Sequence, residues 1–491
     1  MVRTKVTGRF VVGYANGDHV IYPDGEVVYE GDTVVFAGHG YPGPVDAVLD
    51  AGEALVSPGF IDLDALGDID HAILDSWLDP GRVAGQRWSE EYFRSGRREV
   101  FPFEEEVFKR RYALVQLLLN GITTAMPIAA ETYRAWAETY EELAATAEIA
   151  AELGLRIYLG PSYRGGVNFT RMDGTPDVLW DEALGEEGLR QAVRFVRDYD
   201  GRHGGLIRGV LLPARIETNT PEVLRRTRAY SDELGCPLRL HAAQGQLEVR
   251  FLRDWYGKRP LELLHELGVL GPRTLIPHAT TLGDHGAGAD PHGDLALLRD
   301  SGTTVVHCPL ISARHGGALD SFGRYRRLGI NLALGTDTYP PDMIRVMDYG
   351  STIGKLMARD QASSSAADLF RAATLGGARA LGREDLGRLA PGARADIAIV
   401  DLGALHTGPV DDPIRTLLYN TSGASVRTVI INGRTVMADR RIPGVDADDL
   451  RERAQRYFAR YKAAYTERDY LRRPVEELFP ASFPVVARRS S

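Results

Sequence analysis

The stretch that decides the fold reads Leu55-Val56-Ser57-Pro58-Gly59-Phe60-Ile61-Asp62-Leu63-Asp64-Ala65-Leu66-Gly67-Asp68-Ile69-Asp70-His71. An apolar run is followed by a Pro-Gly pair and then by a second apolar run. Short apolar runs are typical of buried strands, and Pro-Gly pairs interrupt regular structure. We therefore expect the chain to leave a small β domain here and to enter the first strand of a larger sheet, over residues 55–61.

The sequence before this stretch has the pattern of a small β domain. Short β-type runs at 9–12, 20–22, 26–29, 33–37 and 47–50 are separated by turn residues, among them Pro23-Asp24-Gly25. Toward the other end, 395–401 and 426–434 are strand-like again, and Asn432-Gly433 is a strong hairpin signal. We expect residues 1–56 and 390–446 to form one β-sandwich.

Between residues 107 and 337 one unit repeats, in which an amphipathic helix is followed by a glycine and an apolar strand. Glycine just past a helix is a common C-terminal cap, and near-continuous apolar strands indicate a parallel sheet covered on both faces. With 55–61, the predicted strands are 122–126, 155–159, 207–212, 237–241, 274–278, 303–307 and 330–337, and the helices include 133–153, 187–198, 221–234 and 260–267.

Eight such strands are the number that a (β/α)8 TIM-type barrel requires. The predicted fold class is therefore α/β, with the barrel over residues 57–389. A doubly wound sheet is the structural alternative, which eight successive units disfavour. Residues 447–491 are predicted to form a C-terminal helical tail, with a charged helix over 448–473 as a solvated surface element.

Composition narrows the class of protein. The chain has 491 residues, 44% of them hydrophobic and 25% charged, as is typical of globular proteins. Its 58 basic and 67 acidic residues give a net charge of −9, without the basic footprint of a nucleic-acid binder. We expect no signal peptide, and no apolar run approaches the ~20 residues of a membrane span.

The two cysteines, Cys236 and Cys308, argue against a disulfide framework, and we expect Cys308 to be buried rather than nucleophilic. The expected location is therefore cytoplasmic. The expected partner is a small-molecule substrate, not nucleic acid or membrane, and a homodimer is left open.

Polar residues stand where the predicted strands end. His241, His278, His307 and Asp337 close four strands, and Arg164 follows the third strand. The C-terminal ends of the strands form the active-site face of such barrels. These residues are therefore candidates for a functional site.

The same residues carry a resemblance to a known family. Val56–Asp62, His241, His278, His307-Cys308-Pro309 and Leu334-Gly335-Thr336-Asp337 resemble the amidohydrolase superfamily, in particular its cytosine and guanine deaminase and triazine chlorohydrolase branch, and Gly387–Asp396 resembles that family's return into the sandwich. The resemblance covers residues 5–436. It implies a hydrolase of carbon–nitrogen bonds other than peptide bonds, acting on a small cyclic or heterocyclic substrate.

The resemblance also implies roles. His241 and Asp337 would bind a divalent metal, Zn or Fe, which lowers the pKa of a bound water to about 7 and leaves a position for substrate. Asp337 would serve as general base, and His278 would stabilise the reacting oxygen. Arg164 would anchor an anionic substrate, with a surface position as its alternative, and His307 would bind substrate or only pack.

Three positions depart from the family pattern. Asp64 and Leu66 stand where the family has His-x-His, and Gln244 replaces the Glu that protonates substrate three residues after the strand-five His. Gln244 would donate a hydrogen bond but not shuttle a proton. Asp64 would be the third metal ligand.

Asp68, Asp70 and His71 are close enough in sequence to contribute to a metal site as well. We expect a weakly held or absent metal. The alternative function is a metal-independent descendant, such as a lyase, an isomerase or a small-molecule binder, that reuses the barrel pocket.

Overall fold

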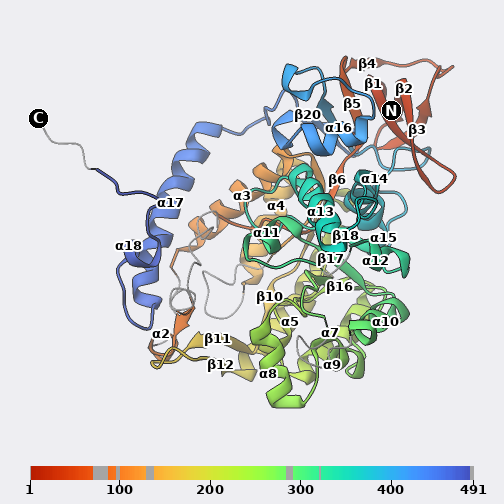
Figure 1. The fold of residues 1–491 in the computed structure, drawn as a ribbon. Coiled ribbons are helices and arrows are strands. Elements are labelled where there is room, and N and C mark those ends of the chain that lie inside the picture. Colours follow the sequence, from red (N-terminus) through yellow and green to blue (C-terminus); the bar gives the residue numbers. More distant parts are fainter. Residues whose placement is uncertain are drawn as a thin grey trace, which may run out of the picture.

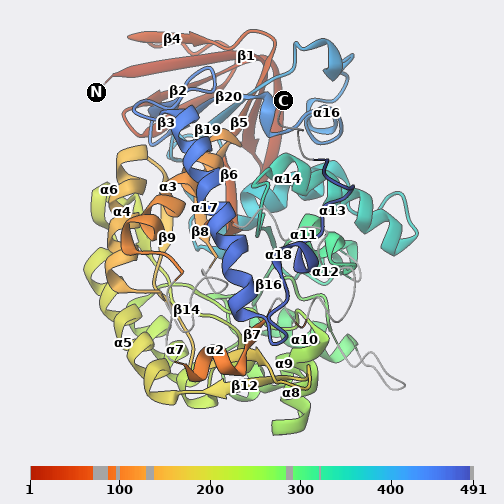
Figure 2. The ribbon, with the colours of Figure 1, turned by 90° about the vertical axis from the view of Figure 1, so that its left-hand side faces the viewer.

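The structure is a computed structural model that describes residues 2–69, 84, 87–95, 100–128, 138–282, 291–319 and 322–486. Its framework is one mixed sheet and one parallel sheet, each of eight strands. Figure 1 and Figure 2 show the mixed sheet at one end of the molecule and the helices around the parallel sheet. None of the helices in these ranges combines the length and the apolar composition of a membrane span.

Both chain ends contribute to the mixed sheet. In spatial order its strands are β21 (Arg434–Met437), β20 (Val426–Ile431), β19 (Ile397–Asp401), β5 (Ala54–Pro58), β1 (Arg3–Ala15), β2 (Asp18–Glu30) and β3 (Thr33–Gly38), and β4 (Ala47–Asp50) also pairs with β1. Strands β19 and β5 pair antiparallel, with Ile397 opposite Pro58. The N-terminal strands, red in Figure 1, and the C-terminal strands, blue, therefore belong to one hydrogen-bonded sheet at one end of the molecule.

Strand β2 differs from the prediction. The turn expected at Pro23-Asp24-Gly25 is absent, and one strand continues through it. The pair Gly8–Gly25 on one side and the pair Phe10–Pro23 on the other keep β2 in register with β1. Asp24 adopts a left-handed backbone with φ of 49°. Pairing with a long partner strand thus overrides the local turn signal.

The first strand of the parallel sheet begins later than predicted. The single strand expected over 55–61 is wrong, because the chain divides at Gly59 into β5 of the mixed sheet and β6 (Phe60–Ala65) of the parallel sheet. A Cβ atom on Gly59 would lie 2.1 Å from Cγ2 of Thr123, so only glycine fits where the chain passes between the sheets.

The parallel sheet contains the other seven predicted strand regions. Its order is β13 (Ile207–Gly209), β9 (Arg156–Leu159), β8 (Ile122–Pro127), β6, β18 (Leu332–Leu334), β17 (Thr304–His307), β16 (Thr274–Pro277) and β15 (Leu238–Arg239). Shorter pairings join β10 (Ser162–Tyr163) to β14 (Leu212–Pro213), and β11 (Gly166–Thr170) to both β7 (Trp88–Ser89) and β12 (Pro176–Trp180).

Helices connect and cover these strands. They are α2 (Glu90–Arg94), α3 (Phe103–Leu119), α4 (Tyr140–Leu153), α5 (Glu182–Tyr199), α6 (Arg202–Gly205), α7 (Pro221–Leu234), α8 (Gln246–Tyr256), α9 (Pro260–Glu266), α10 (Pro291–Ser301), α11 (Pro309–Arg314), α12 (Phe322–Arg327), α13 (Met343–Ala358), α14 (Ala366–Arg371), α15 (Gly377–Ala380), α16 (Pro413–Asn420), α17 (Ala447–Arg468) and α18 (Val475–Leu478).

Helix boundaries follow capping more closely than apolar periodicity. Helix α7 has the predicted bounds, with Thr220 as its N-cap and Gly235 as its C-cap. Helix α4 begins at Tyr140 instead of residue 133, because Thr139 and Glu142 form a capping box. Residues 129–137 lie outside the described residues.

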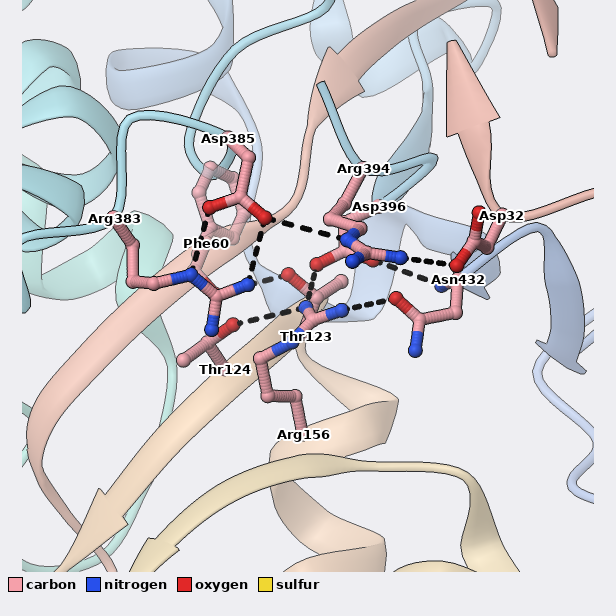
Figure 3. A network of polar contacts seen from close by, with 10 residues as sticks. All are labelled: Asp32, Phe60, Thr123, Thr124, Arg156, Arg383, Asp385, Arg394, Asp396 and Asn432. Carbon is pink, nitrogen blue, oxygen red and sulfur yellow. Dashed lines mark hydrogen bonds and ion pairs between the residues drawn. The ribbon is translucent and has the colours of Figure 1, made fainter. Parts of the chain in front are cut away.

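A buried ion network joins the two sheets (Figure 3). Arg156 at the start of β9 has a side chain that is 1% exposed and pairs with Asp396. The same guanidinium reaches Asn432, whose main-chain N–H donates to Asp396 Oδ1 over 2.9 Å. Because breaking a buried ion pair leaves an unpaired charge, this network holds the mixed sheet on the parallel one.

The C-terminal helix α17 is not a simple solvated element, as predicted for 448–473. Tyr457, Tyr461 and Tyr465, spaced four residues apart, are fully buried. The ring of Tyr457 stacks on Phe101 with centroids 3.8 Å apart. Most charged residues of α17 are exposed or half-buried, whereas Arg468 at its end is buried. The helix lies along one side of the molecule (Figure 2).

Candidate active site

Four predicted site residues meet at the C-terminal ends of parallel strands. Asp64 lies in β6, His278 follows β16, and His241 and Asp337 follow β15 and β18 by a few residues. The Oδ2 atom of Asp64 is 3.6 Å from His241 Nε2 and 3.9 Å from His278 Nε2. The Nε2 atom of His278 is also 3.4 Å from Oδ2 of Asp337. These contacts join the ends of four strands into one polar group.

The four side chains differ in access to solvent. Those of Asp64 and His278 are 0% and 3% exposed, whereas those of His241 and Asp337 are each 13% exposed. A substrate therefore reaches His241 and Asp337 first. Asp64 has no direct access to solvent.

Two of these residues have an unusual backbone. The φ angles of His278 and Asp337 are 64° and 61°, in the left-handed region that costs a non-glycine residue about 1–3 kcal/mol. The main-chain N–H of His278 donates to Val306 over 2.9 Å, and that of Asp337 donates to the Asp64 carbonyl over 2.6 Å. These main-chain hydrogen bonds at the strand ends thus hold both residues in a backbone conformation that isolated residues avoid.

Asp62 supports the site from below. It stands two residues before Asp64 and therefore on the same face of β6. Its carboxylate accepts hydrogen bonds from the main-chain N–H of Thr336 over 3.1 Å and from its hydroxyl over 2.6 Å. Burial raises the pKa of Asp62 to about 7. Asp62 thus anchors the segment that carries Asp337.

Burial and neighbouring charges move the pKa values of the site residues in opposite directions. Burial alone would raise the pKa of Asp64, but the positive charge of Arg239 and the side-chain hydrogen bond with His241 lower it. Burial, reinforced by the negative charge of Asp64, raises the pKa of Asp337 well above its usual range. Burial lowers the pKa of His278 to about 3. His278 is therefore neutral near pH 7 and acts by hydrogen bonding.

Gln244 lies near the group, in the loop that follows His241. Its side-chain oxygen accepts a hydrogen bond from Arg215 Nη1 over 2.6 Å, so its amide N–H groups remain as the donors. The carboxylate of Glu248 accepts from the main-chain N–H groups of Ala243 and Gln244 over 2.5 and 3.1 Å. Burial, with Glu217 nearby, raises the pKa of Glu248 to about 8. The loop is thus fixed by buried polar contacts.

The sequence prediction omitted Arg215 and Arg239. The Arg239 side chain is 2% exposed, and its Nη1 lies 3.3 Å from Asp64 Oδ1. One signal was available, because Arg239 and His241 are two residues apart and alternate residues of a strand share a face. For Arg215, which follows β14, no sequence signal pointed to Gln244.

Three other predicted residues are also buried. His307 is 3% exposed, with its ring 5.8 Å from that of Phe322, and burial lowers its pKa to about 3. Arg164 is 6% exposed, so its surface alternative is wrong. Asp68 Oδ2 lies 4.0 Å from Nζ of Lys109. Asp70 and His71 lie outside the described residues.

Three of the side chains are arranged to hold a metal ion. The ligand atoms of Asp64, His241 and His278 all lie within 4.8 Å of one another. Among the described contacts, the buried Nε2 atom of His278 has no hydrogen-bond partner. Imidazole nitrogen and carboxylate oxygen suit Zn²⁺ and Fe²⁺. These residues therefore fit a divalent metal, whereas the buried side chain of Leu66 supplies no ligand.

Comparison with known proteins places the chain among enzymes of one family. The model of the Amidohydrolase family matches residues 55–436. A 5-methylthioadenosine/S-adenosylhomocysteine deaminase of Natronomonas pharaonis is 29% identical over 445 residues, which cover 89% of this chain and 91% of the relative. A 5'-deoxyadenosine deaminase of Methanosarcina mazei is 26% identical over 437 residues, with coverage of 88% and 92%.

Solved structures show the same fold. A zinc-bound adenosine deaminase of Xanthomonas campestris superimposes with a TM-score of 0.74 at 21% identity, covering 94% of this chain and 99% of that one. A mutant atrazine chlorohydrolase of Arthrobacter aurescens, complexed with zinc and atraton, gives a TM-score of 0.75 at 20% identity, with coverage of 92% and 99%. At these identities the likeness concerns the fold.

Proposed function

This chain belongs to the amidohydrolase family, whose hydrolases act on carbon–nitrogen bonds other than peptide bonds. We propose that it hydrolyses the bond between a ring carbon and the exocyclic amino group of a small nitrogen heterocycle. The observation that carries the proposal is the meeting of Asp64, His241, His278 and Asp337 at the strand ends. The names of the similar deaminases make a 5'-modified adenosine the first substrate to test.

The reaction exchanges an exocyclic amine for oxygen. Water forms a bond to the ring carbon, the carbon–nitrogen bond breaks, and ammonia leaves. Asp337 accepts the proton of the water and returns it to the leaving nitrogen, since Gln244 has no proton to transfer. Its raised pKa suits a group that holds a proton in one step and releases it in the next. When no metal is bound to its Nε2, neutral His278 donates a hydrogen bond to the reacting oxygen.

A divalent metal would be held by Asp64, His241 and His278, with Asp337 beside them. When bound, it would supply Lewis-acid activation of water and substrate. Asp64 would contact the metal but not the substrate, because its side chain is fully buried. His241 and Asp337 orient the reactants at the accessible side.

A test of the function is release of ammonia by the purified chain. The substrates are 5'-deoxyadenosine, 5-methylthioadenosine, guanine, cytosine and an aminotriazine, each with and without added Zn²⁺. Release from at least one of them, abolished by Asp337→Asn, is the expected result. No ammonia from any of them under either condition would overturn the proposal.

A second candidate function has one observation in its favour. Arg239 places a positive charge 3.3 Å from Asp64, so the carboxylate is compensated without a metal. A metal-independent lyase, isomerase or small-molecule binder would use the metal-free pocket, in which Arg239 balances the charge of Asp64. Turnover or ligand binding that is unchanged by chelator, without ammonia release, would favour this alternative.

The barrel and domain assignments are also proposals. The parallel sheet is a closed (β/α)8 barrel, supported by a parallel bridge between Leu211 and Leu238 that links the segment after β13 to β15. The division assigns 1–56 with 390–446 to a β-sandwich, 57–389 to the barrel and 447–491 to a helical tail. A cytoplasmic location, a small-molecule partner and a homodimer stay predictions.

A further inference from the structure

Arg239 is enclosed by main-chain oxygens beneath the candidate site. Its Nη1 donates to the carbonyls of Leu63 and Met126 over 3.1 and 2.6 Å, and its Nη2 donates to that of Pro127 over 2.7 Å. These acceptors belong to the neighbouring strands β6 and β8. A guanidinium held by three carbonyls has little freedom to move, so its charge stays beneath Asp64.

The two oxygens of Asp64 face different partners. Oδ1 faces Nη1 of Arg239 at 3.3 Å. Oδ2 faces Nε2 of His241 and of His278, and Sγ of Cys308 donates to it over 3.6 Å. The carboxylate is therefore a bridge between a fixed cation and the atoms that would bind a metal.

We propose that Arg239 is a positioning residue that aims Asp64 Oδ2 at the two imidazoles and, through its charge, weakens the binding of a divalent cation at Asp64, His241 and His278. The inference rests on the proposed function only in taking these three residues as the metal site. In this site Arg239 compensates the charge of the Asp64 carboxylate. In a site without such an arginine, only the bound metal would do so.

The physical reason is competition between two cations for one anion. A buried carboxylate without a partner is strongly unfavourable, and a metal that relieved this state would gain binding free energy. Arg239 has already relieved it. The guanidinium of Arg239 and the divalent cation would also repel each other, because buried charges are only weakly screened.

The experiment measures Zn²⁺ and Co²⁺ dissociation constants by titration after dialysis against chelator. Arg239→Met and Arg239→Gln remove the charge, and Gln keeps an N–H donor for the carbonyls if Met prevents folding. Arg239→Lys keeps the charge. We expect both neutral variants to bind about tenfold more tightly or better, and the Lys variant to remain within about threefold of the parent. The Co²⁺ absorption spectrum should gain intensity in the neutral variants only.

Arg156→Met is the matched control. Arg156 is also buried and paired with a carboxylate, Asp396, but in the junction of the two sheets (Figure 3). This variant should lower the melting temperature without changing metal affinity. Equal or weaker binding by both neutral variants, or no binding by any variant, would overturn the inference. Ammonia release is measured separately, so failure of the proposed reaction is distinguishable from failure of the role of Arg239.

Discussion

The main-chain N–H of Asp337 donates to the main-chain carbonyl of Asp64 over 2.6 Å. This bond ties the end of the last strand of the parallel sheet, β18, to the first, β6. It also holds Asp337 in its left-handed conformation, with the carboxylate 3.4 Å from His278. The two acidic residues are therefore positioned by one backbone contact, and a change in either strand end moves both.

Removal of the proposed base should abolish activity but leave the fold intact. Asp337→Asn keeps the main-chain bond to Asp64 and removes proton transfer, so kcat should fall about 10²–10⁴-fold. His241→Ala should likewise abolish turnover. Steady-state kinetics and thermal unfolding are the measurements, with Asp300→Asn at an exposed position as control. Near-parental turnover in both site variants would show that the site is assigned wrongly.

Restoring the missing Glu should not restore ordinary deamination. In Gln244→Glu the new carboxylate would pair with Arg215, which now donates to the Gln244 oxygen. Leu66 would still occupy a ligand position, so we expect no robust deamination of cytosine or guanine. Gln246→Glu, at an exposed neighbouring position, is the control. Strong ammonia release from Gln244→Glu alone would mean that the lost Glu, not the lost His pair, was decisive.

The parent chain should hold metal weakly. Asp64→His combined with Leu66→His supplies two imidazoles, and metal content after dialysis against chelator should rise well above that of the parent. The reason is that each missing ligand leaves a coordination position to water, which confers no chelate advantage. Elemental analysis measures the outcome, with His265→Ala on the surface of α9 as control. About one metal per parent chain, with no gain from the double change, contradicts this expectation.

His19 should make stability fall in mild acid. Its Nε2 lies 2.9 Å from Oγ1 of Thr374, and burial lowers its pKa to about 4. The folded state therefore prefers the neutral ring. The contribution of His19 to the free energy of unfolding is fully present above about pH 6.5 and is lost as pH falls toward 4.

Relative to His19→Gln, the free energy of unfolding of the parent should fall by at most about 1.4 kcal/mol per pH unit in that window. Urea titrations at pH 7.5 and pH 5 measure it. The exposed His265→Gln should show no such trend. A parent-to-variant difference that is the same at both pH values would exclude His19 as the cause.

The buried face of α17 should contribute to stability. Tyr461 is fully buried, and Tyr461→Ala should lower the free energy of unfolding by about 3–5 kcal/mol. Arg456→Ala, on the exposed face of the same helix, should change it by no more than about 0.5 kcal/mol. Chemical denaturation compares the two. Similar small effects in both would mean that α17 is as solvated as its charge pattern suggests.

Much of the fold could be predicted because its signals are local. Helix α7 has the predicted bounds, since Thr220-Pro221 at one end and Gly235 at the other are capping residues within the segment itself. Strand patterns at both chain ends predicted one β-sandwich, which stays a prediction, and the structure pairs β19 with β5 in one mixed sheet. The turn at residues 23–25 was wrong, because a continuous partner strand decides whether β2 bends.

The sequence by itself determined the family and the strand ends that carry His241, His278 and Asp337, because apolar runs and the residues that follow them are properties of short segments. Only the tertiary structure decided what surrounds Asp64. Arg239 reaches it although β15 and β6 are far apart in sequence and are not neighbours in the strand order of the parallel sheet. Burial then fixes the pKa directions of Asp64, His278 and Asp337. Such contacts depend on how distant strands assemble and exclude water, which no local pattern of residues specifies.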